Sequence, residues 1–233
     1  MALRHLRLIA VNIDGVLLND TFSPVIHRFV VKHGGIYTAE LERAVLSQPR
    51  LQAAAAIGVP GSPQEVVAAY FLERERYLAE HPVHIQDGAV RLLERLRGLD
   101  MPLICYGGLD RPHFDSYLGA YADHFEQPQY VCTDGFRPGV REIAEDVFGL
   151  RCDQVLFIDD VARVAEAART LGAAFLGHPS SYEHSFQHQL MREAGVRHLV
   201  RSLDEVDESL LRTLDSEAAE GTMWRDSPLA VCA

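Results

Sequence analysis

The sequence predicts a doubly wound (Rossmann-like) α/β fold with a parallel sheet and an inserted all-helical cap domain. Two observations predict it. From residue 85 onwards, short apolar segments alternate with helical patterns about a dozen residues long, which is typical of a parallel sheet covered on both faces. Residues 20–84, which follow the first apolar segment, carry only helical patterns. We therefore expect an α/β core at residues 1–19 and 85–215, a helical cap at 20–84, and a mobile tail at 216–233.

The first strand is expected at Leu6–Ile13, an apolar run that ends in Asn-Ile-Asp-Gly. A long helical stretch follows, from Ser23 to Glu80, with glycines that mark turns between its helices. Within it, Ser62-Pro63-Gln64-Glu65 has the pattern of a capping box with proline at the first helical position. This pattern predicts an amphipathic helix over Pro63–Glu80.

The remaining elements alternate along the chain. The apolar runs predict strands at Pro102–Tyr106, Gln129–Thr133, Gln154–Ile158, Ala174–Leu176 and His198–Val200. The periodic stretches predict helices at Asp87–Gly98, Arg111–Tyr121, Gly139–Phe148, Val161–Leu171, His184–Ala194 and Ser202–Leu214. Ser216–Ala233 has no period and is expected to be a mobile tail.

Composition and charge exclude several classes of function. The chain has 233 residues, 48% of them hydrophobic, and a formal net charge of −11, which argues against binding to nucleic acid. No apolar run is long enough for a transmembrane helix, so we expect no membrane association and a cytoplasmic location. The four cysteines show no CxxC spacing and are expected to be reduced thiols. The oligomeric state is left open.

Residues with useful chemistry follow four of the predicted strands. Asn12 and Asp14 follow the first, Gly107 and Gly108 the second, Arg137 the third, and Asp159-Asp160 the fourth. In an open parallel sheet, ligands bind beyond the carboxyl ends of the strands, so these side chains are expected to meet. Carboxylates suit Mg²⁺, whereas arginine and the backbone N–H groups of a glycine-rich turn suit a phosphate.

These motifs, in this order, resemble those of the haloacid dehalogenase superfamily of phosphohydrolases, over about residues 6–215. The resemblance implies a role for each position. Asn12 stands where the family has its nucleophilic Asp, and Asp14 matches the general acid/base, whose backbone carbonyl also binds Mg²⁺. Gly107 stands where a phosphate-binding Ser or Thr is expected, next to Gly108. Arg137 matches the basic, substrate-binding position. The metal ligands implied are residue 12, Asp14 and the acidic pair, with Asp160 the direct ligand and Asp159 its neighbour.

Three departures from the family pattern decide the functional hypothesis. A carboxamide at residue 12 cannot act as the nucleophile, Gly107 lacks a hydroxyl, and Val164 stands where the family often has Asp or Asn. We therefore expect a phosphatase-like protein whose activity is lost or severely weakened, and which retains binding of a small phosphorylated molecule and of Mg²⁺ with reduced affinity. An engineered replacement of Asp by Asn12 is an alternative that Gly107 argues against.

Two further hypotheses stay open. One is an active Mg²⁺-dependent phosphomonoester hydrolase of a small metabolite, with water activated by Asp14 in place of a covalent step. The other is a non-catalytic interaction or regulatory protein. The sequence does not identify a substrate.

Overall fold

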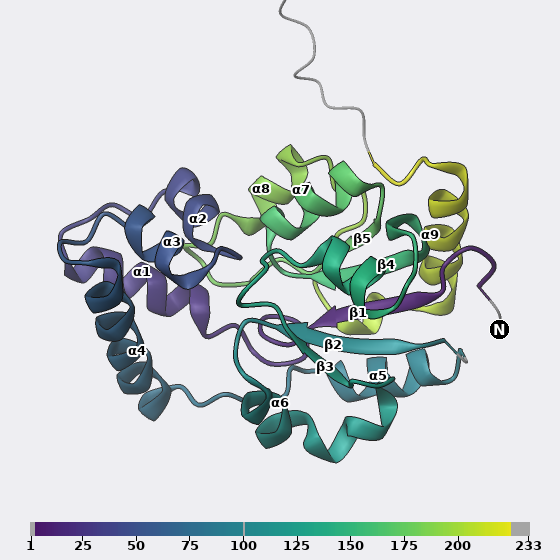
Figure 1. The fold of residues 1–233 in the computed structure, drawn as a ribbon, viewed down its shortest axis with the longest axis horizontal. Helices are drawn as coiled ribbons and strands as arrows, with labels where there is room; N and C mark the ends of the chain where they lie inside the picture. Colours follow the sequence, from purple (N-terminus) through teal and green to yellow (C-terminus); the bar gives the residue numbers. More distant parts are fainter. Residues whose placement is uncertain (1–2, 100, 225–233) are drawn as a thin grey trace, which may run out of the picture.

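A five-stranded parallel sheet forms the centre of the computed structural model, which describes residues 3–99 and 101–224. The strands lie in the order β3-β2-β1-β4-β5, and every neighbouring pair is parallel. Their bounds are β1 Leu8–Asn12, β2 Leu103–Gly107, β3 Tyr130–Cys132, β4 Val155–Asp159 and β5 Ala174–Gly177. This order places β1 in the middle, with the carboxyl ends of β2 and β4 on either side of Asn12 (Figure 1).

Helices cover both faces of the sheet, as the alternating pattern predicts. Alternate strand residues such as Val11, Cys105 and Ile158 pack into one apolar core with α5 (Ala89–Arg97), α6 (Arg111–Leu118) and α9 (Glu208–Glu220). Residues of the opposite parity pack into a second core. It includes residues of α7 (Ala162–Leu171), α8 (Gln187–Glu193) and a π-helix at Glu142–Val147, and it continues into the helices inserted between β1 and α5. Short 3₁₀ segments lie at Gly119–His124, Cys152–Gln154 and Leu203–Glu205. The fold class is the doubly wound α/β class that the sequence predicts.

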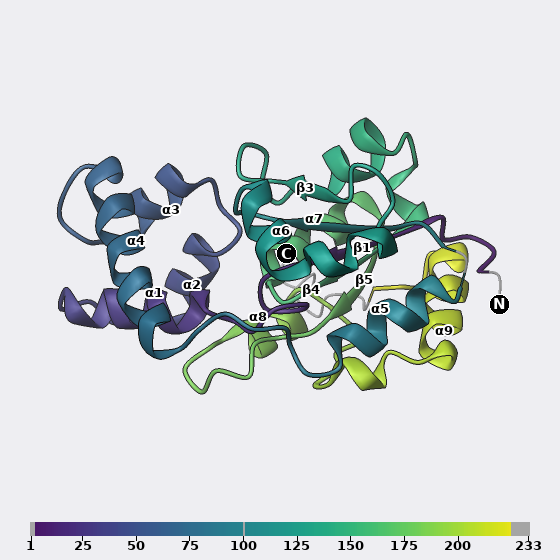
Figure 2. The ribbon, with the colours of Figure 1, turned by 90° about the horizontal axis from the view of Figure 1, so that it is seen from below.

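Four helices between β1 and α5 form a separate lobe beyond the carboxyl ends of the strands (Figures 1 and 2). They are α1 (Phe22–Lys32), α2 (Ala39–Val45), α3 (Arg50–Ala56) and α4 (Pro63–Glu80). The capping box at the start of α4 is present: the Ser62 hydroxyl accepts from Glu65 N–H, and the Glu65 carboxylate accepts from Ser62 N–H. We call α1–α4 the helical lobe.

The helical lobe is bonded to the core at several points. The fully buried Glu42 carboxylate of α2 accepts from Ser185 Oγ (2.9 Å), Phe186 N (2.8 Å) and Gln187 Nε2 (2.7 Å). In addition, the Asp20 carboxylate caps the N-terminus of α1 and accepts from Ser180 Oγ at 2.6 Å. These hydrogen bonds connect the helical lobe to the core.

Some predicted elements differ from the structure. The predicted strand at His198–Val200 is reduced to one bridge between Leu199 and Gly177, because β5 itself ends at Gly177. The predicted helix Ser202–Leu214 begins with a 3₁₀ turn, and α9 then continues to Glu220. The prediction of a mobile tail from Ser216 is therefore wrong as far as Glu220. Ala218 is buried there, and the Asp215 carboxylate accepts the N–H groups of residues 4–6.

The last nine residues of the predicted tail, 225–233, lie outside the described residues. Among the helices that are described, none combines the length and the apolar character needed to cross a bilayer.

Candidate functional site

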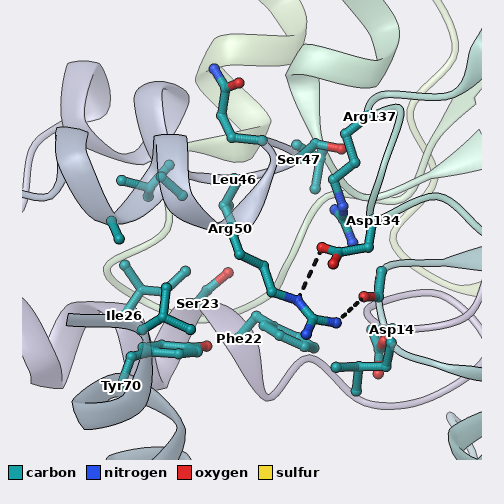
Figure 3. A pocket seen from close by; sticks show the side chains of 18 of the residues that line it. Asp14, Phe22, Ser23, Ile26, Leu46, Ser47, Arg50, Tyr70, Asp134 and Arg137 are labelled. Carbon is teal, nitrogen blue, oxygen red and sulfur yellow. Dashed lines mark hydrogen bonds and ion pairs between the residues drawn. The ribbon is translucent and has the colours of Figure 1, made fainter. Parts of the chain in front are cut away.

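A cavity of about 150 Å³ lies between the carboxyl ends of the strands and the helical lobe. Five of the residues singled out from the sequence line it: Asn12, Asp14, Gly108, Arg137 and Asp160. Figure 3 shows Asp14, Asp134 and Arg137 on the core side, facing Tyr70 and Ile26 of the lobe. The structure thus gathers residues from four strand ends at one place, which is the geometry expected of a ligand site in this class of sheet.

The loop after β1 packs tightly against the end of β4. Gly15 has a φ of +85°, and a Cβ atom there would lie 2.0 Å from Oδ2 of Asp160. Only glycine therefore allows the Asp14-Gly15 turn to approach the Asp160 carboxylate this closely. With this close approach, the Asn12 amide reaches both the Asp14 carbonyl and the Asp160 carboxyl group.

The Asn12 side chain uses both of its amide hydrogens inside this loop. Nδ2 donates to the backbone carbonyl of Asp14 at 2.8 Å and to Oδ1 of Asp160 at 2.9 Å. The orientation is assigned by these partners, because the opposite orientation would place the amide oxygen against two acceptors. Asn12 therefore donates to the two oxygens that the family resemblance names as metal ligands.

The Asp14 carboxylate has a partner that the sequence analysis missed. Nε2 of His113, in the first turn of α6, lies 2.8 Å from Oδ1 of Asp14, and each side chain is only 11% exposed. The sequence does contain a signal for this contact: His113 lies in the first turn of a helix that follows a strand, and such a turn points toward the strand ends. The Asp14–His113 pair is the one acid–imidazole contact at this cavity among the described residues.

The two carboxylates at the end of β4 have different surroundings. Asp159 does not line the cavity; its carboxylate accepts from the Tyr106 hydroxyl and, at 2.7 Å, from Val161 N–H. Burial raises the pKa of Asp159 to about 6, against the opposing effect of these donors. Burial, together with the neighbouring Asp159 charge, raises the pKa of Asp160 well above its usual value. Of the pair, only Asp160 faces the cavity.

The two glycines after β2 are in different environments. A Cβ atom on Gly107 would lie 2.4 Å from Cγ2 of Ile13, so the position expected to carry Ser or Thr has no room for a side chain. A Cβ atom on Gly108 would lie 1.2 Å from one guanidinium nitrogen of Arg137. Gly108 therefore leaves a place for the end of the Arg137 side chain. Of the two glycines, Gly108 lines the cavity and Gly107 does not.

Arg137 and Arg50 differ in how they are paired. Arg50, at the start of α3, donates to the Gly108 carbonyl at 2.8 Å and forms an ion pair with Asp134 at 3.0 Å (Figure 3). Neither Arg50 nor Asp134 was identified from the sequence, because their contact joins segments far apart in the chain. Arg137 has no ion pair or hydrogen bond within residues 3–99 and 101–224. Its charge acts on the buried Asp159 carboxyl group without a direct contact, so the N–H groups of Arg137 remain available to a ligand.

The lobe side of the cavity is mostly apolar. It is lined by side chains from all four helices and the loops between them: Phe22, Ile26, Val45, Leu46, Ala53, Ala54, Ile57, Val66, Val67, Tyr70 and Phe71. Asp20, Ser23, Ser47, Gln48 and Arg50 are the polar and charged residues that line this side, and the buried Tyr70 hydroxyl has no hydrogen-bond partner among the described residues. The cavity thus has a charged floor and an apolar wall.

The residues at the floor do not fit the Mg²⁺ that the family resemblance implies. In the described ranges, no group of three or more His, Cys, Asp and Glu side chains is placed to hold a metal ion. The Asp14 carbonyl and Asp160 Oδ1 already accept hydrogens from Asn12, and the Asp14 carboxylate contacts His113. The Asn12 N–H groups point at these two oxygens, so a Mg²⁺ ion could approach them from this side only if the Asn12 side chain turned away.

Comparison with solved structures shows which fold this is. A haloacid dehalogenase-like protein of unknown function from Agrobacterium tumefaciens matches with a TM-score of 0.61 and 19% identity, over 89% of this chain and 99% of the other. A haloacid dehalogenase (HAD) family hydrolase from Deinococcus radiodurans, solved with bound phosphate and sodium, matches with a TM-score of 0.58 and 17% identity, over 96% and 99%.

A third match is a HAD hydrolase, family IA, variant 3, from Entamoeba histolytica, with a TM-score of 0.64 and 14% identity, over 91% and 100%. No family model matches the chain, and no curated protein does. The structural matches confirm that the chain has the haloacid dehalogenase-like fold.

Proposed function

We propose that this protein binds a small anion in the cavity of a haloacid dehalogenase-like fold and has lost phosphoryl transfer through residue 12. The observation that carries the proposal is the position of the Asn12 amide. Its nitrogen donates to the Asp14 carbonyl and to Asp160, at the point where the family resemblance would place a nucleophile and a metal.

The chemistry of the amide supports the loss of covalent catalysis. A carboxamide is a poor nucleophile, and no base near neutral pH deprotonates it. Gly107 also argues against phosphoryl transfer. A Ser or Thr side chain at this position would have to displace Ile13, so no hydroxyl is available there. Both positions that would contact a transferred phosphoryl group have therefore lost the necessary atoms.

The same amide replaces the metal ion in this proposal. Its two N–H groups donate to the Asp14 carbonyl and to the Asp160 carboxyl group, so each of these oxygens has a hydrogen-bond partner without a cation. For Mg²⁺ to bind, the Asn12 side chain would have to turn and give up both hydrogen bonds. We therefore infer that the Mg²⁺ affinity is weak and that ligand binding does not require the metal.

Arg137 supports the binding of an anion. Its guanidinium lines the cavity and has no ion pair in the part of the chain that is described. A guanidinium suits a phosphate or carboxylate because it offers two parallel N–H donors. The Deinococcus protein with this fold contains a bound phosphate, which is consistent with an anion in such a cavity.

The test combines an activity assay with calorimetry. The purified protein, with and without Mg²⁺, is assayed for phosphate release from a panel of phosphomonoesters and titrated with inorganic phosphate. We expect phosphate binding that is independent of Mg²⁺ and lost in Arg137→Gln, and no turnover. Turnover that Asp14→Ala abolishes would overturn the proposal. If neither phosphate nor Mg²⁺ binds, the interaction-protein hypothesis is favoured instead.

A second candidate function is supported by the Asp14–His113 pair. A carboxylate oriented by an imidazole can act as a general base, and Asp14 lines the cavity whereas His113 lies behind it. Such a pair would allow slow hydrolysis by direct attack of water, without a covalent intermediate. This function requires that His113→Gln and Asp14→Asn each remove the turnover, whereas Asn12→Ala leaves it.

A further inference from the structure

We propose that the ligand of this cavity is an anion with an apolar body the size of one aromatic ring. The proposal rests on the anion-binding role proposed above and adds the chemical class of the ligand. It follows from three properties of the cavity: its one available cation, its apolar wall and its size.

Arg137 places the charged end of the ligand. Arg50 is already bonded to Asp134 and to the Gly108 carbonyl, so its charge is neutralised within the protein. Arg137 has no such partner among the described residues and lies against Gly108, at the strand ends. The charged head of the ligand therefore lies near Gly108, and its body extends toward the helical lobe.

The mostly apolar wall of the lobe favours an apolar body. Phe22, Ile26 and Phe71 line it, together with small alanine and valine side chains of α3 and α4. Ser23, Ser47 and Gln48 also line the cavity, but a sugar or nucleoside carries more hydroxyl or ring nitrogen atoms than these three side chains can pair, and each unpaired buried atom is unfavourable. An aromatic or branched aliphatic body carries no such atoms.

The Tyr70 hydroxyl offers one polar contact within this wall. It is buried and has no hydrogen-bond partner in residues 3–99 and 101–224. Burial raises the pKa of the Tyr70 hydroxyl, so it stays protonated and is available as a donor. A single acceptor atom on the apolar body is therefore allowed, and Figure 3 shows the Tyr70 ring on the lobe side of the cavity.

The volume of the cavity suits a body of one aromatic ring. The cavity measures about 150 Å³. An apolar protein cavity of roughly this volume accepts one benzene molecule. Phenyl phosphate and benzoate therefore represent the proposed class, with a phosphate and a carboxylate head on the same ring.

The experiment measures affinity by calorimetry with four probes in Mg²⁺-free buffer. They are phenyl phosphate, benzoate, inorganic phosphate and glucose 6-phosphate. We expect phenyl phosphate or benzoate to bind about 10- to 100-fold more tightly than inorganic phosphate, since a buried ring contributes that much by the hydrophobic effect. Glucose 6-phosphate is expected to bind no more tightly than inorganic phosphate, and the two aromatic probes distinguish a phosphate head from a carboxylate head.

Matched variants of one helix test the wall. Val67 of α4 lines the cavity, whereas Leu72 of the same helix is 49% exposed and does not. Val67→Gln should lower the affinity for the aromatic probe about tenfold and leave the affinity for inorganic phosphate unchanged. Leu72→Gln should change neither affinity. Circular dichroism verifies that both variants fold.

Two outcomes overturn the inference in distinguishable ways. Equal affinities for phenyl phosphate, inorganic phosphate and glucose 6-phosphate would refute the apolar body while leaving the anion site intact. No binding of any probe would refute the anion site, and the inference with it.

Discussion

Nε2 of His113 lies 2.8 Å from Oδ1 of Asp14, so the first turn of α6 is bonded to the loop after β1 at the floor of the cavity. Both side chains are nearly buried, which makes the loss of one partner unfavourable for the other. We expect His113→Ala to lower the free energy of unfolding by about 1–3 kcal/mol. Urea denaturation of His113→Ala, Asp14→Ala and the double variant measures the coupling; additive effects would show that the contact contributes nothing.

Asn12→Asp should make the fold dependent on a divalent cation. The substitution places a carboxylate oxygen near Oδ1 of Asp160, which is now 2.9 Å from the amide nitrogen. Without Mg²⁺, we expect a loss of about 2–4 kcal/mol, because two carboxyl groups this close in a buried site either repel each other or must take up a proton. Added Mg²⁺ should raise the Tm of this variant and leave that of the wild type unchanged. Asn12→Ala is the control, because it removes the donors without adding a charge; a wild-type response equal to that of Asn12→Asp would contradict the proposal.

Gly107→Ala and Gly108→Ala should have different effects on the stability of the protein. At Gly107 the new methyl group meets Ile13, a fully buried side chain, so we expect a loss of stability of about 1–3 kcal/mol. At Gly108 the new methyl group meets only the movable end of Arg137. Gly108→Ala should therefore change stability by less than about 1 kcal/mol and weaken phosphate binding. Thermal denaturation and calorimetry on both variants check this; unchanged phosphate affinity in Gly108→Ala would argue against the position assigned to Arg137.

The fold was predictable because its signals are local. Alternating apolar runs, the Ser62–Glu65 capping box and the Asp14-Gly15 turn each depend on a few neighbouring residues. The matches to solved structures of the same fold confirm the class predicted from them. The continuation of α9 past Ser216 was missed because its cause is distant: Asp215 bonds to the N-terminal segment.

The site was predictable only in its strand-end residues. Their positions follow from the parallel sheet, whose carboxyl ends meet at one edge. His113 and Arg50 come from helices whose orientation depends on tertiary packing. Asp134 forms its ion pair with Arg50, which is more than eighty residues away in the sequence. The roles assigned to Asp14, Arg137 and Asp160 stay predictions until binding and activity are measured.

Asp159 should make stability depend on pH. Burial raises its pKa to about 6, above the value of about 4 expected in an unfolded chain. The folded state therefore binds this proton more tightly, so the contribution of Asp159 is greatest below about pH 4 and falls as the pH rises through 6. Between pH 4 and pH 7, we expect the free energy of unfolding of the wild type to fall by roughly 1–3 kcal/mol more than that of Asp159→Asn. Urea denaturation at both pH values gives this difference; a gap that does not change with pH would contradict the raised pKa.

Glu42 should be the strongest single link between the helical lobe and the core. Its carboxylate is fully buried and accepts from Ser185, Phe186 and Gln187, so an amide in its place would set an N–H group against these donors. We expect Glu42→Gln to lower the free energy of unfolding by about 2–4 kcal/mol and to speed hydrogen exchange in α2 and at residues 185–187. Glu75→Gln, on the exposed face of α4, is the matched control and should change neither. Unchanged exchange in Glu42→Gln would mean that the lobe is held instead by contacts such as Asp20–Ser180, since those persist in the variant.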